Sequence, residues 1–509
     1  MARIIHTNAV SPDDVPIWDQ EQIYNGVDVL ATRQVLDAQL PQLGPETAAT
    51  YDFSRALQGP VLEMGLRGIL VDQQRKNEVI DDFYDKIDHL ERNLSRIVLD
   101  GVGMAGFNPR SPADLQALFY GKLGIPEIRF KGRVTADRAA RDKLYAYTIA
   151  RPIISHLNAI AELGKKISVL RTAIDPDGRI RTSYNIAGTD TGRFSSSYSA
   201  FGTGGNLQNI EESLRSIFIS DPGYKFAKCD AKSGESFIVG AIEWNLFDDP
   251  RYLDACATGD PHTAVAKLCW PDMPWTGDIK LDKKVADNKA KPFYRHFTHR
   301  DLTKKAGHAS NYGGAPATIA TLTGLPIEIV IAFQPKYFSA FPAHLEWQEY
   351  VAQQVATRGF ITNLTGRKRW FWGRRTEPDV VRAAIAYDPQ GSLADIVNRA
   401  LLNIWHKNYV IIMLQDHDAI TFMYPEEMED EIIPRIMEDL IVRVPLKNGR
   451  ELAIPYDSKV GYNRGDYDPK INPDGLRDYV PGDGGRKRTP SPGILDRIIS
   501  RTPKRSVRL

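Results

Sequence analysis

The chain has 509 residues, and its 65 Lys and Arg residues nearly balance its 64 Asp and Glu residues, for a formal net charge of +1. Hydrophobic residues make up 42% and charged residues 25%, which is typical of a folded protein and excludes wholesale disorder. The balanced charge excludes a globally basic surface, so any contact with nucleic acid must come from local clustering. The length predicts two to four domains, at roughly 100–200 residues per domain.

The cellular setting is constrained by what the sequence lacks. The polar residues 1–20 are expected to form a loose leader without the apolar core of a secretory signal. An apolar run near Val410–Leu414 is the longest, far short of the ~18–20 residues that a membrane span needs. Three cysteines without a CxxC pair favour a reducing compartment and argue against structural zinc. We therefore expect a cytoplasmic protein with no membrane partner.

Helical periodicity dominates the first third of the chain. Apolar residues recur at three- and four-residue steps from Val71 to about Gly101, which predicts a long amphipathic helix. A second helical stretch is predicted near Asp137–Leu170. From these patterns alone, the two helices could simply form a core bundle, which is the more common structure for such helices.

The segment Gly223–Trp244 is predicted to be a strand that runs into a helix, with Asp230 at the end of the strand and Glu235 in the first helical turn. An Asp at this point is more often an ordinary turn or cap residue. Tyr409–Tyr424 is predicted to be a hairpin with Asp416, His417 and Asp418 at its tip. Considered alone, this pattern favours an ordinary polar hairpin turn.

The segment from Arg300 to Gly313 carries four functional side chains at steps of four residues: Arg300, Lys304, His308 and Tyr312. On one helical face they would span about 18 Å at 1.5 Å per residue, comparable to an extended nucleoside triphosphate. Two cations near the positive end of the helix dipole would suit phosphates. The alternative is a solvated basic helix.

The C-terminal stretch Pro481–Leu509 has eight basic and two acidic residues and is predicted to be disordered. Phosphate contacts with DNA and a purely solubilising role remain equal alternatives for it.

In this order, the segments containing Asp230, Arg300–Gly313 and Asp418 resemble motifs A, B and C of the family A DNA polymerases, the bacterial polymerase I type. The resemblance covers roughly residues 53–465. Further matches in the family's order are Thr191–Ser196 (TGRFSS), Asn206–Ile210 (NLQNI), Arg382–Ile385 (RAAI), Pro389–Gly391 (PQG), Ala394–Asp395 (AD) and Gln415–Asp418 (QDHD).

The resemblance implies an α+β right-hand fold, with an antiparallel-sheet palm, helical fingers and a helical thumb. The expected parts are a leader with the remnant of an exonuclease-domain terminal helix (1–52), the thumb (53–190), the palm (191–245 and 376–475), the fingers (246–375) and a basic disordered tail (476–509).

The implied activity is template-directed addition of deoxynucleoside triphosphates to a primer 3′-hydroxyl. By resemblance, Asp230 and Asp418, helped by the backbone carbonyl of Ala231, would hold two Mg²⁺ ions. One ion would lower the pKa of the primer hydroxyl, and the other would neutralise the triphosphate and the leaving pyrophosphate.

The resemblance also assigns the surrounding side chains. Arg300, Lys304 and His262 would contact the triphosphate, Tyr312 would stack near the templating base, His308 would lie at the sugar, and Glu235 would exclude ribonucleotides. Primer–template contacts, mainly in the minor groove, are expected from Arg193, Gln208, Asn209, Arg382, Gln390 and His417.

Three residues depart from the family pattern: His308 replaces an aromatic Phe or Tyr, Ala419 replaces a glutamate, and Ala231 replaces a tyrosine. These departures bear on sugar selectivity and fidelity, and not on the principal metal ligands. Two other function classes remain as alternatives: a single-subunit RNA polymerase, and a catalytically inactive DNA-binding accessory protein.

The segment Tyr24–Asp28 resembles the Tyr-x-x-x-Asp helix that ends the family's 3′→5′ exonuclease domain, although an ordinary amphipathic helix is the alternative. A single carboxylate cannot hold two ions, so we expect no proofreading by this chain itself. Either the activity has been lost or, slightly favoured, a separate exonuclease chain docks at residues 1–50. The short chain and His308 favour a bacteriophage enzyme acting in the host cytoplasm, with a processivity factor as a further candidate partner.

Overall fold

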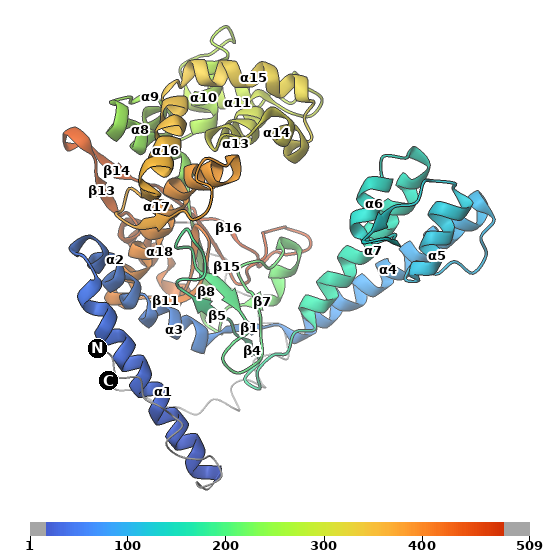
Figure 1. Ribbon diagram of the computed structural model, residues 1–509, viewed down its shortest axis with the longest axis horizontal. Coiled ribbons are helices and arrows are strands. Elements are labelled where there is room, and N and C mark those ends of the chain that lie inside the picture. Colours follow the sequence, from blue (N-terminus) through green and yellow to red (C-terminus); the bar gives the residue numbers. More distant parts are fainter. Residues whose placement is uncertain (1–16, 483–509) are drawn as a thin grey trace.

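The structure is a computed structural model that describes residues 17–482, with side chains described from residue 21 onward. Residues 1–16 of the expected leader and residues 483–509 of the expected tail lie outside the described residues. In the rest of the chain, one sheet carries three groups of helices: a helical cap, a long arm and an N-terminal pair (Figure 1).

The central sheet has five antiparallel strands in the order β11-β12-β8-β15-β16. Their bounds are β8 (Tyr224–Ala231), β11 (Ile411–Asp416), β12 (Ala419–Pro425), β15 (Tyr456–Gly461) and β16 (Arg477–Asp478). Strand β8 lies in the middle and pairs along its length with both β12 and β15. Because β16 belongs to the sheet, the chain is ordered beyond residue 476, where the tail was expected to start.

The long helix α17 (Pro378–Lys407) packs against α8 (Gly234–Phe247), which leaves the end of β8 after a short turn. The two helices meet so closely that a Cβ atom on Gly234 would lie 2.5 Å from Leu393 Cδ1. Leu393 is completely buried, so it has no free space into which to move. This close approach fixes the start of α8, and therefore Glu235, relative to the sheet.

A helical cap covers one end of the sheet and is drawn at the top of Figure 1. It contains α9 (Arg251–Ala257), α10 (Pro261–Cys269), α11 (Ile279–Ala286), α12 (His299–Leu302), η7 (Thr303–Gly307), α13 (His308–Asn311), α14 (Pro316–Thr323), α15 (Ile327–Ala340) and α16 (Ala343–Arg358). A hairpin of β9 (Phe360–Thr362) and β10 (Lys368–Trp370) leads from the cap back to α17.

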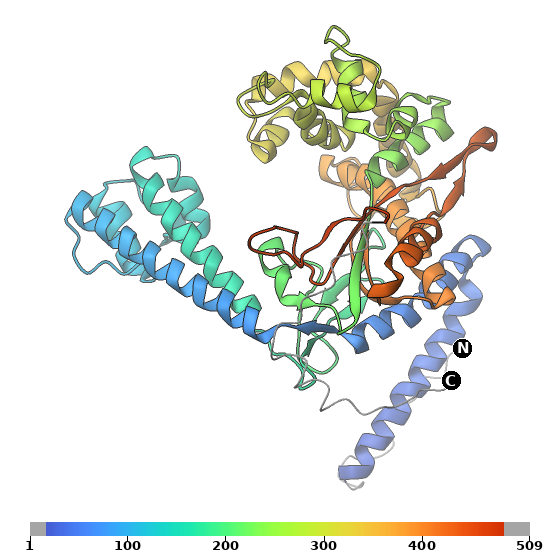
Figure 2. The same ribbon diagram turned by 180° about the vertical axis from the view of Figure 1, so that it is seen from behind.

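A helical arm projects from the other end of the sheet (Figure 2). It is built on the antiparallel helices α4 (Gln73–Val102) and α7 (Arg151–Leu170), with α5 (Pro112–Gln116), η4 (Ala117–Lys122) and α6 (Arg138–Leu144) at its tip. The predicted long amphipathic helix is confirmed, and its buried residues Leu94 and Val98 belong to a separate core within the arm. The arm therefore has its own hydrophobic interior.

The arm is shorter than the 53–190 segment expected for a thumb. Helix α3 (Gln58–Arg67) packs against β11, α17 and β5 (Ser183–Asn185), and not against α4 or α7. Between α3 and the arm, β1 (Ile69–Val71) pairs with β4 (Arg179–Ile180) and β7 (Phe218–Ile219). The arm proper thus covers residues 73–170, and the segments on either side of it belong with the sheet.

The N-terminal helices are α1 (Ile17–Gln39) and α2 (Pro45–Ala56), and α1 extends away from the body in both views (Figures 1 and 2). Its apolar side chains are exposed: Ile23, Tyr24, Val29, Leu30 and Val35. Among the described residues, no single helix is long and apolar enough to span a membrane. The sharply bent pair α14–α15 meets the criteria of length and composition only when its two helices are counted together.

Substituting Gly234 with Ala should destabilise the protein by about 1–3 kcal/mol, because the new methyl group overpacks the α8–α17 contact. The matched control is Gly164→Ala within α7, where a Cβ meets no atom within 4 Å and should stabilise by about 0.5–1 kcal/mol. Urea unfolding followed by circular dichroism measures both changes. Equal effects of the two substitutions would contradict the close contact.

Candidate active site

The sheet brings Asp230 and Asp418 together although they are 188 positions apart in the sequence. Asp230 lies directly opposite Ala419 on the neighbouring strand, and the Ala231 N–H donates to the Asp418 carbonyl over 3.0 Å. Asp418 occupies a two-residue turn with His417, whose φ of +55° is left-handed. Such a value suits the right-handed twist of a tight hairpin, although it strains a residue other than glycine. The predicted strand and hairpin are confirmed.

Both carboxylates lie in an environment that disfavours their negative charge. Desolvation raises the pKa of Asp230, and the nearby carboxylates of Asp457 and Asp416 raise it further. Burial raises the pKa of Asp418 to about 6, with a smaller contribution from Glu235 and an opposing one from Arg193. Negative charge crowded on one face of a sheet attracts cations.

One oxygen of this pair has no hydrogen-bond partner. Asp418 Oδ1 is buried and accepts no hydrogen bond in the described structure, and Arg193 Nη2 lies 3.5 Å from it. Among residues 17–482, no cluster of three or more His, Cys, Asp and Glu side chains forms a ready-made metal cage. Two carboxylates with an unsatisfied oxygen nevertheless fit Mg²⁺, which commonly binds one or two carboxylates together with waters and substrate phosphates.

Glu235 is the centre of a second set of contacts. Its Oε1 accepts a 2.6 Å hydrogen bond from Arg193 Nη2, and its Oε2 accepts a short hydrogen bond from the Tyr312 hydroxyl. His308 Nε2 lies 3.6 Å from the same Oε2. Burial and the Glu235 charge raise the pKa of Tyr312 well above its ordinary value. Because Arg193 also lies beside Asp418, Glu235 links the cap helix to the carboxylate pair.

The predicted helix that carries Arg300 to Tyr312 is not regular. Residues Thr303–Gly307 form a π-helical turn between two short α-helical turns, so the regular four-residue face predicted from the sequence is wrong there. Such turns are frequent at functional sites. Thr298 and Asp301 form a capping box that satisfies the first backbone N–H groups. Phosphate binding here would therefore depend on the side chains and not on the helix N-terminus.

Arg300 is held by a carboxylate that sequence reasoning missed. It donates hydrogen bonds of 3.0–3.3 Å to Asp260, which also accepts one from Thr263. Burial alone would raise the pKa of Asp260, but these hydrogen bonds lower it below its usual value. Burial, reinforced by Arg300, lowers the pKa of His262 to about 4, so this imidazole is neutral at pH 7. Lys304 is exposed.

Several expected DNA contacts gather beside the hairpin. Gln208 is buried and donates from Nε2 to the backbone oxygen of Gln415 at 3.0 Å, while Gln415 donates to the His417 carbonyl at 2.6 Å. His417 Nε2 lies 3.3 Å from Asn209 Oδ1. The segment containing Gln208 and Asn209 therefore supports the strained turn directly.

Two further expected DNA-contacting residues lie apart from this group, on α17. Arg382 is exposed and pairs with Asp379 one turn earlier on the same helix, and Gln390 is half-buried. The described hydrogen bonds join neither residue to Asp230, Asp418 or Glu235.

A buried polar network beneath the cap was not foreseen. Glu243 and His344 are 1% and 0% exposed and form a short hydrogen bond. His344 contacts the Tyr337 hydroxyl at 3.1 Å, which donates to Asn311 at 2.6 Å, and Asn311 donates to the Tyr252 hydroxyl at 3.0 Å. Asn311 immediately precedes the tyrosine that contacts Glu235. The one sign of this network in the sequence was that a single helix, α8, carries both Glu235 and Glu243.

With this geometry in place, comparison with known proteins identifies the class. The family model for DNA polymerase family A matches residues 73–464, and the chain belongs to this family. The expected α+β fold with an antiparallel sheet is confirmed.

Among curated relatives, the thermostable DNA polymerase I of Thermus filiformis is 24% identical, covering 86% of this chain and 50% of the relative. DNA polymerase I of Chloroflexus aurantiacus is 26% identical, covering 88% and 46%. The chain thus spans about half the length of these relatives. A solved structure, the polymerase domain of Pol1 from M. smegmatis in complex with DNA primer-template and dNTP, matches with a TM-score of 0.61 and 24% identity, covering 81% of this chain and 69% of that one. This likeness concerns the fold.

Replacing His344 with Leu should destabilise the protein by about 3–5 kcal/mol near neutral pH, because it leaves the Glu243 charge buried without its partner. Burial raises the pKa of Glu243 and the imidazole opposes that shift, so the variant carboxyl should take up a proton at still higher pH. The free energy of unfolding of the variant should therefore fall as pH rises, more steeply than in the wild type.

Urea unfolding at acidic and neutral pH measures this slope. The control replaces both Glu243 and His344 with Leu and should recover much of the loss. A loss of the same size at every pH would contradict the charged-pair interpretation.

Proposed function

We propose that this chain is a template-directed DNA polymerase that adds deoxynucleoside triphosphates to a primer 3′-hydroxyl. The main support is the placement of Asp230 at the end of β8 and of Asp418 in the hairpin turn beside it, with a buried Asp418 oxygen that has no hydrogen-bond partner. Membership of the polymerase family and the resemblance of the fold to a polymerase domain point the same way.

The carboxylates and the Ala231 carbonyl are the groups that would hold two Mg²⁺ ions. When bound, such ions stabilise the charge on the attacking and leaving oxygens of an in-line displacement. Asp230 and Asp418 fix where that charge is placed, because β8 and β12 pair in one register and the Ala231 N–H donates to the Asp418 carbonyl. Arg300 and Lys304 then supply positive charge for a triphosphate, and Asp260 holds the Arg300 guanidinium in a set orientation.

Glu235 is the residue that we propose sets the choice of sugar. Arg193 and Tyr312 hold both of its oxygens, so its side chain is rigid and can block a 2′-hydroxyl sterically. His308, next to the same carboxylate, would border the sugar. Neutral His262 would donate a hydrogen bond to the triphosphate.

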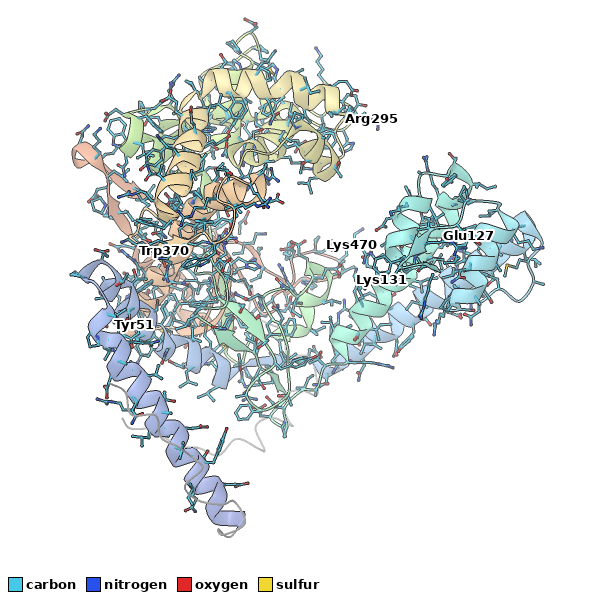
Figure 3. The ribbon with its side chains drawn as sticks, viewed as in Figure 1. Tyr51, Glu127, Lys131, Arg295, Trp370 and Lys470 are labelled. Carbon is cyan, nitrogen blue, oxygen red and sulfur yellow. The ribbon has the colours of Figure 1, made fainter. Side chains whose placement is uncertain are left out.

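The parts of the fold suit this function. We propose that the arm acts as the thumb, the cap as the fingers and the five-stranded sheet with α17 as the palm. Cations from all three parts, Lys131 on the arm, Arg295 on the cap and Lys470 on the palm, are exposed and labelled in Figure 3. Together with Gln208, Asn209, His417, Arg382 and Gln390 they would bind primer–template DNA.

We further propose that α1 receives a separate exonuclease chain. The support is the exposure of its apolar side chains, with Tyr24 67% exposed. The processivity factor, the bacteriophage origin and the location in the host cytoplasm remain predictions.

Substituting Asp230 or Asp418 with Asn should lower kcat for primer extension by at least about a hundredfold, because several kcal/mol of charge stabilisation is lost. Affinity for primer–template DNA should change little. Asp254→Asn, which alters an exposed carboxylate on α9, is the matched control and should behave as the wild type.

Primer extension is measured with deoxy- and ribonucleotides in parallel. Wild-type extension with ribonucleotides only would favour an RNA polymerase, and extension by neither would favour an inactive accessory protein.

Substituting Glu235 with Ala should raise the kcat/KM for ribonucleotides relative to deoxynucleotides by about tenfold or more, since the steric block is removed. The same change frees Arg193 and Tyr312, so kcat for deoxynucleotides should fall as well. Tyr312→Phe separates the two effects, because it removes the hydrogen bond and keeps the glutamate. An unchanged sugar preference in Glu235→Ala would disprove the proposed role.

A further inference from the structure

Two tryptophans project from the surface where the β9–β10 hairpin ends: Trp370 is the last residue of β10, and Trp372 follows two residues later. Trp370 is 50% exposed and Trp372 is 80% exposed, whereas Phe371 between them is 5% exposed. The alternation follows from extended backbone, in which successive side chains point to opposite sides. Phe371 packs inward, edge to face with Tyr387 of α17, so the core fixes the direction of both indoles.

The exposed rings form a continuous aromatic surface. The ring centroids of Trp370 and Trp372 are 6.2 Å apart and their planes differ by only 22°. Phe360 on the partner strand extends the surface, with its centroid 4.8 Å from that of Trp370. Exposed aromatic surface of this size usually marks a binding site.

Positive charge surrounds these rings. The segment 358–376 contains six Lys and Arg residues and no Asp or Glu. Arg358 and Lys368 lie over the Phe360 ring at 5.3 and 5.2 Å, and Arg374 is largely exposed. Lys368 pairs with Glu46, a carboxylate that is itself 65% exposed, so this ion pair is weak and exchangeable.

The hairpin that carries these rings also contacts the segment that leads to Arg193 in the candidate active site. Arg369 pairs with Asp190 at 2.7 Å, and the Arg367 side chain packs close to Gly192, where an added Cβ would lie 3.0 Å from Nε. The next residue along the chain, Arg193, contacts Glu235 and Asp418. Figure 3 labels Trp370 on the side of the palm that is turned away from the arm. A strand reaching it would therefore leave the site on the side opposite the proposed thumb.

We propose that Phe360, Trp370 and Trp372, with Arg358 and Lys368 beside them, bind single-stranded DNA on the side of the palm that is turned away from the arm. Aromatic faces stack on bases and cations contact phosphates, which is the arrangement used for single strands of any sequence. Duplex DNA hides its base faces in the stack, so it cannot use the indoles in this way. The proposal rests on the proposed polymerase function, because that function supplies an unpaired template or a displaced strand.

The test compares the wild-type chain with a double variant, Trp370→Ala and Trp372→Ala, whose exposed side chains leave the core intact. Fluorescence anisotropy at fixed salt measures binding of labelled oligothymidylate. The Kd should rise at least about fivefold in the double variant, because stacking of bases on the two indoles is lost. The matched control is Phe201→Ala, which removes another exposed aromatic ring, and the variant with Phe at both tryptophan positions should retain most of the affinity.

Substrates distinguish the source of the strand. If the template binds here, the variant should lose affinity for a primer–template with a 5′ template overhang and not for a blunt duplex. If a displaced strand binds here, the loss should appear only with a downstream flap. Either result supports the proposal.

The proposal is overturned if oligothymidylate binding is unchanged, or if blunt duplex loses as much affinity as single strands do. It is also overturned if the variant only abolishes self-association in sedimentation, since the surface would then be a protein interface. Failure of the wild type to extend any primer, with tryptophan-dependent strand binding intact, would reject the polymerase function and leave this site standing.

Discussion

The pairing register of β8 between β12 and β15 is the constraint on which the site depends. Asp230 faces Ala419 on one side and Asp457 on the other, and Ala231 is tied by its N–H to Asp418. A slip of one residue would turn Asp230 to the opposite face of the sheet, among buried apolar side chains. The apolar residues that alternate with it along β8, such as Cys229, are completely buried and hold the register.

Helix α8 transmits this fixed geometry to the cap. Near its start Glu235 binds Arg193 and Tyr312, and two turns later Glu243 binds His344 inside the cap. The cap segment that contains Asn311 and Tyr312 is thus held at two points, by Glu235 at the candidate active site and by the buried network of Glu243 and His344. A satisfied buried network of this kind rigidifies the groups that it joins.

Electrostatics in the site are arranged in opposed pairs. Carboxylates gather at one end of strands β8 and β12, where burial raises the pKa of Asp418 to about 6. Cations gather on the cap segment 300–304 and near the β9–β10 hairpin. Arg193 and Arg300 are each held by a carboxylate, so their positions are set before any ligand binds. Preorganised charge of this kind is what phosphoryl transfer requires of a protein.

Local sequence patterns were sufficient to predict several secondary-structure elements and the residue types of the site. The amphipathic helix α4, the strand before Glu235 and the hairpin around His417 follow from periodicity and turn chemistry, which act over a few residues. The spacing of Arg300 and Lys304 was also visible, but not the π-helical turn between them.

Which side chains contact one another in the site depends on how distant segments of the chain pack together. Asp260 with Arg300, Glu243 with His344, and the orphaned oxygen of Asp418 arise from packing between segments that are distant in sequence, and no local pattern encodes such pairings. The attachment of α3 to the sheet was decided in the same way, because its burial depends on a partner surface and not on its own periodicity.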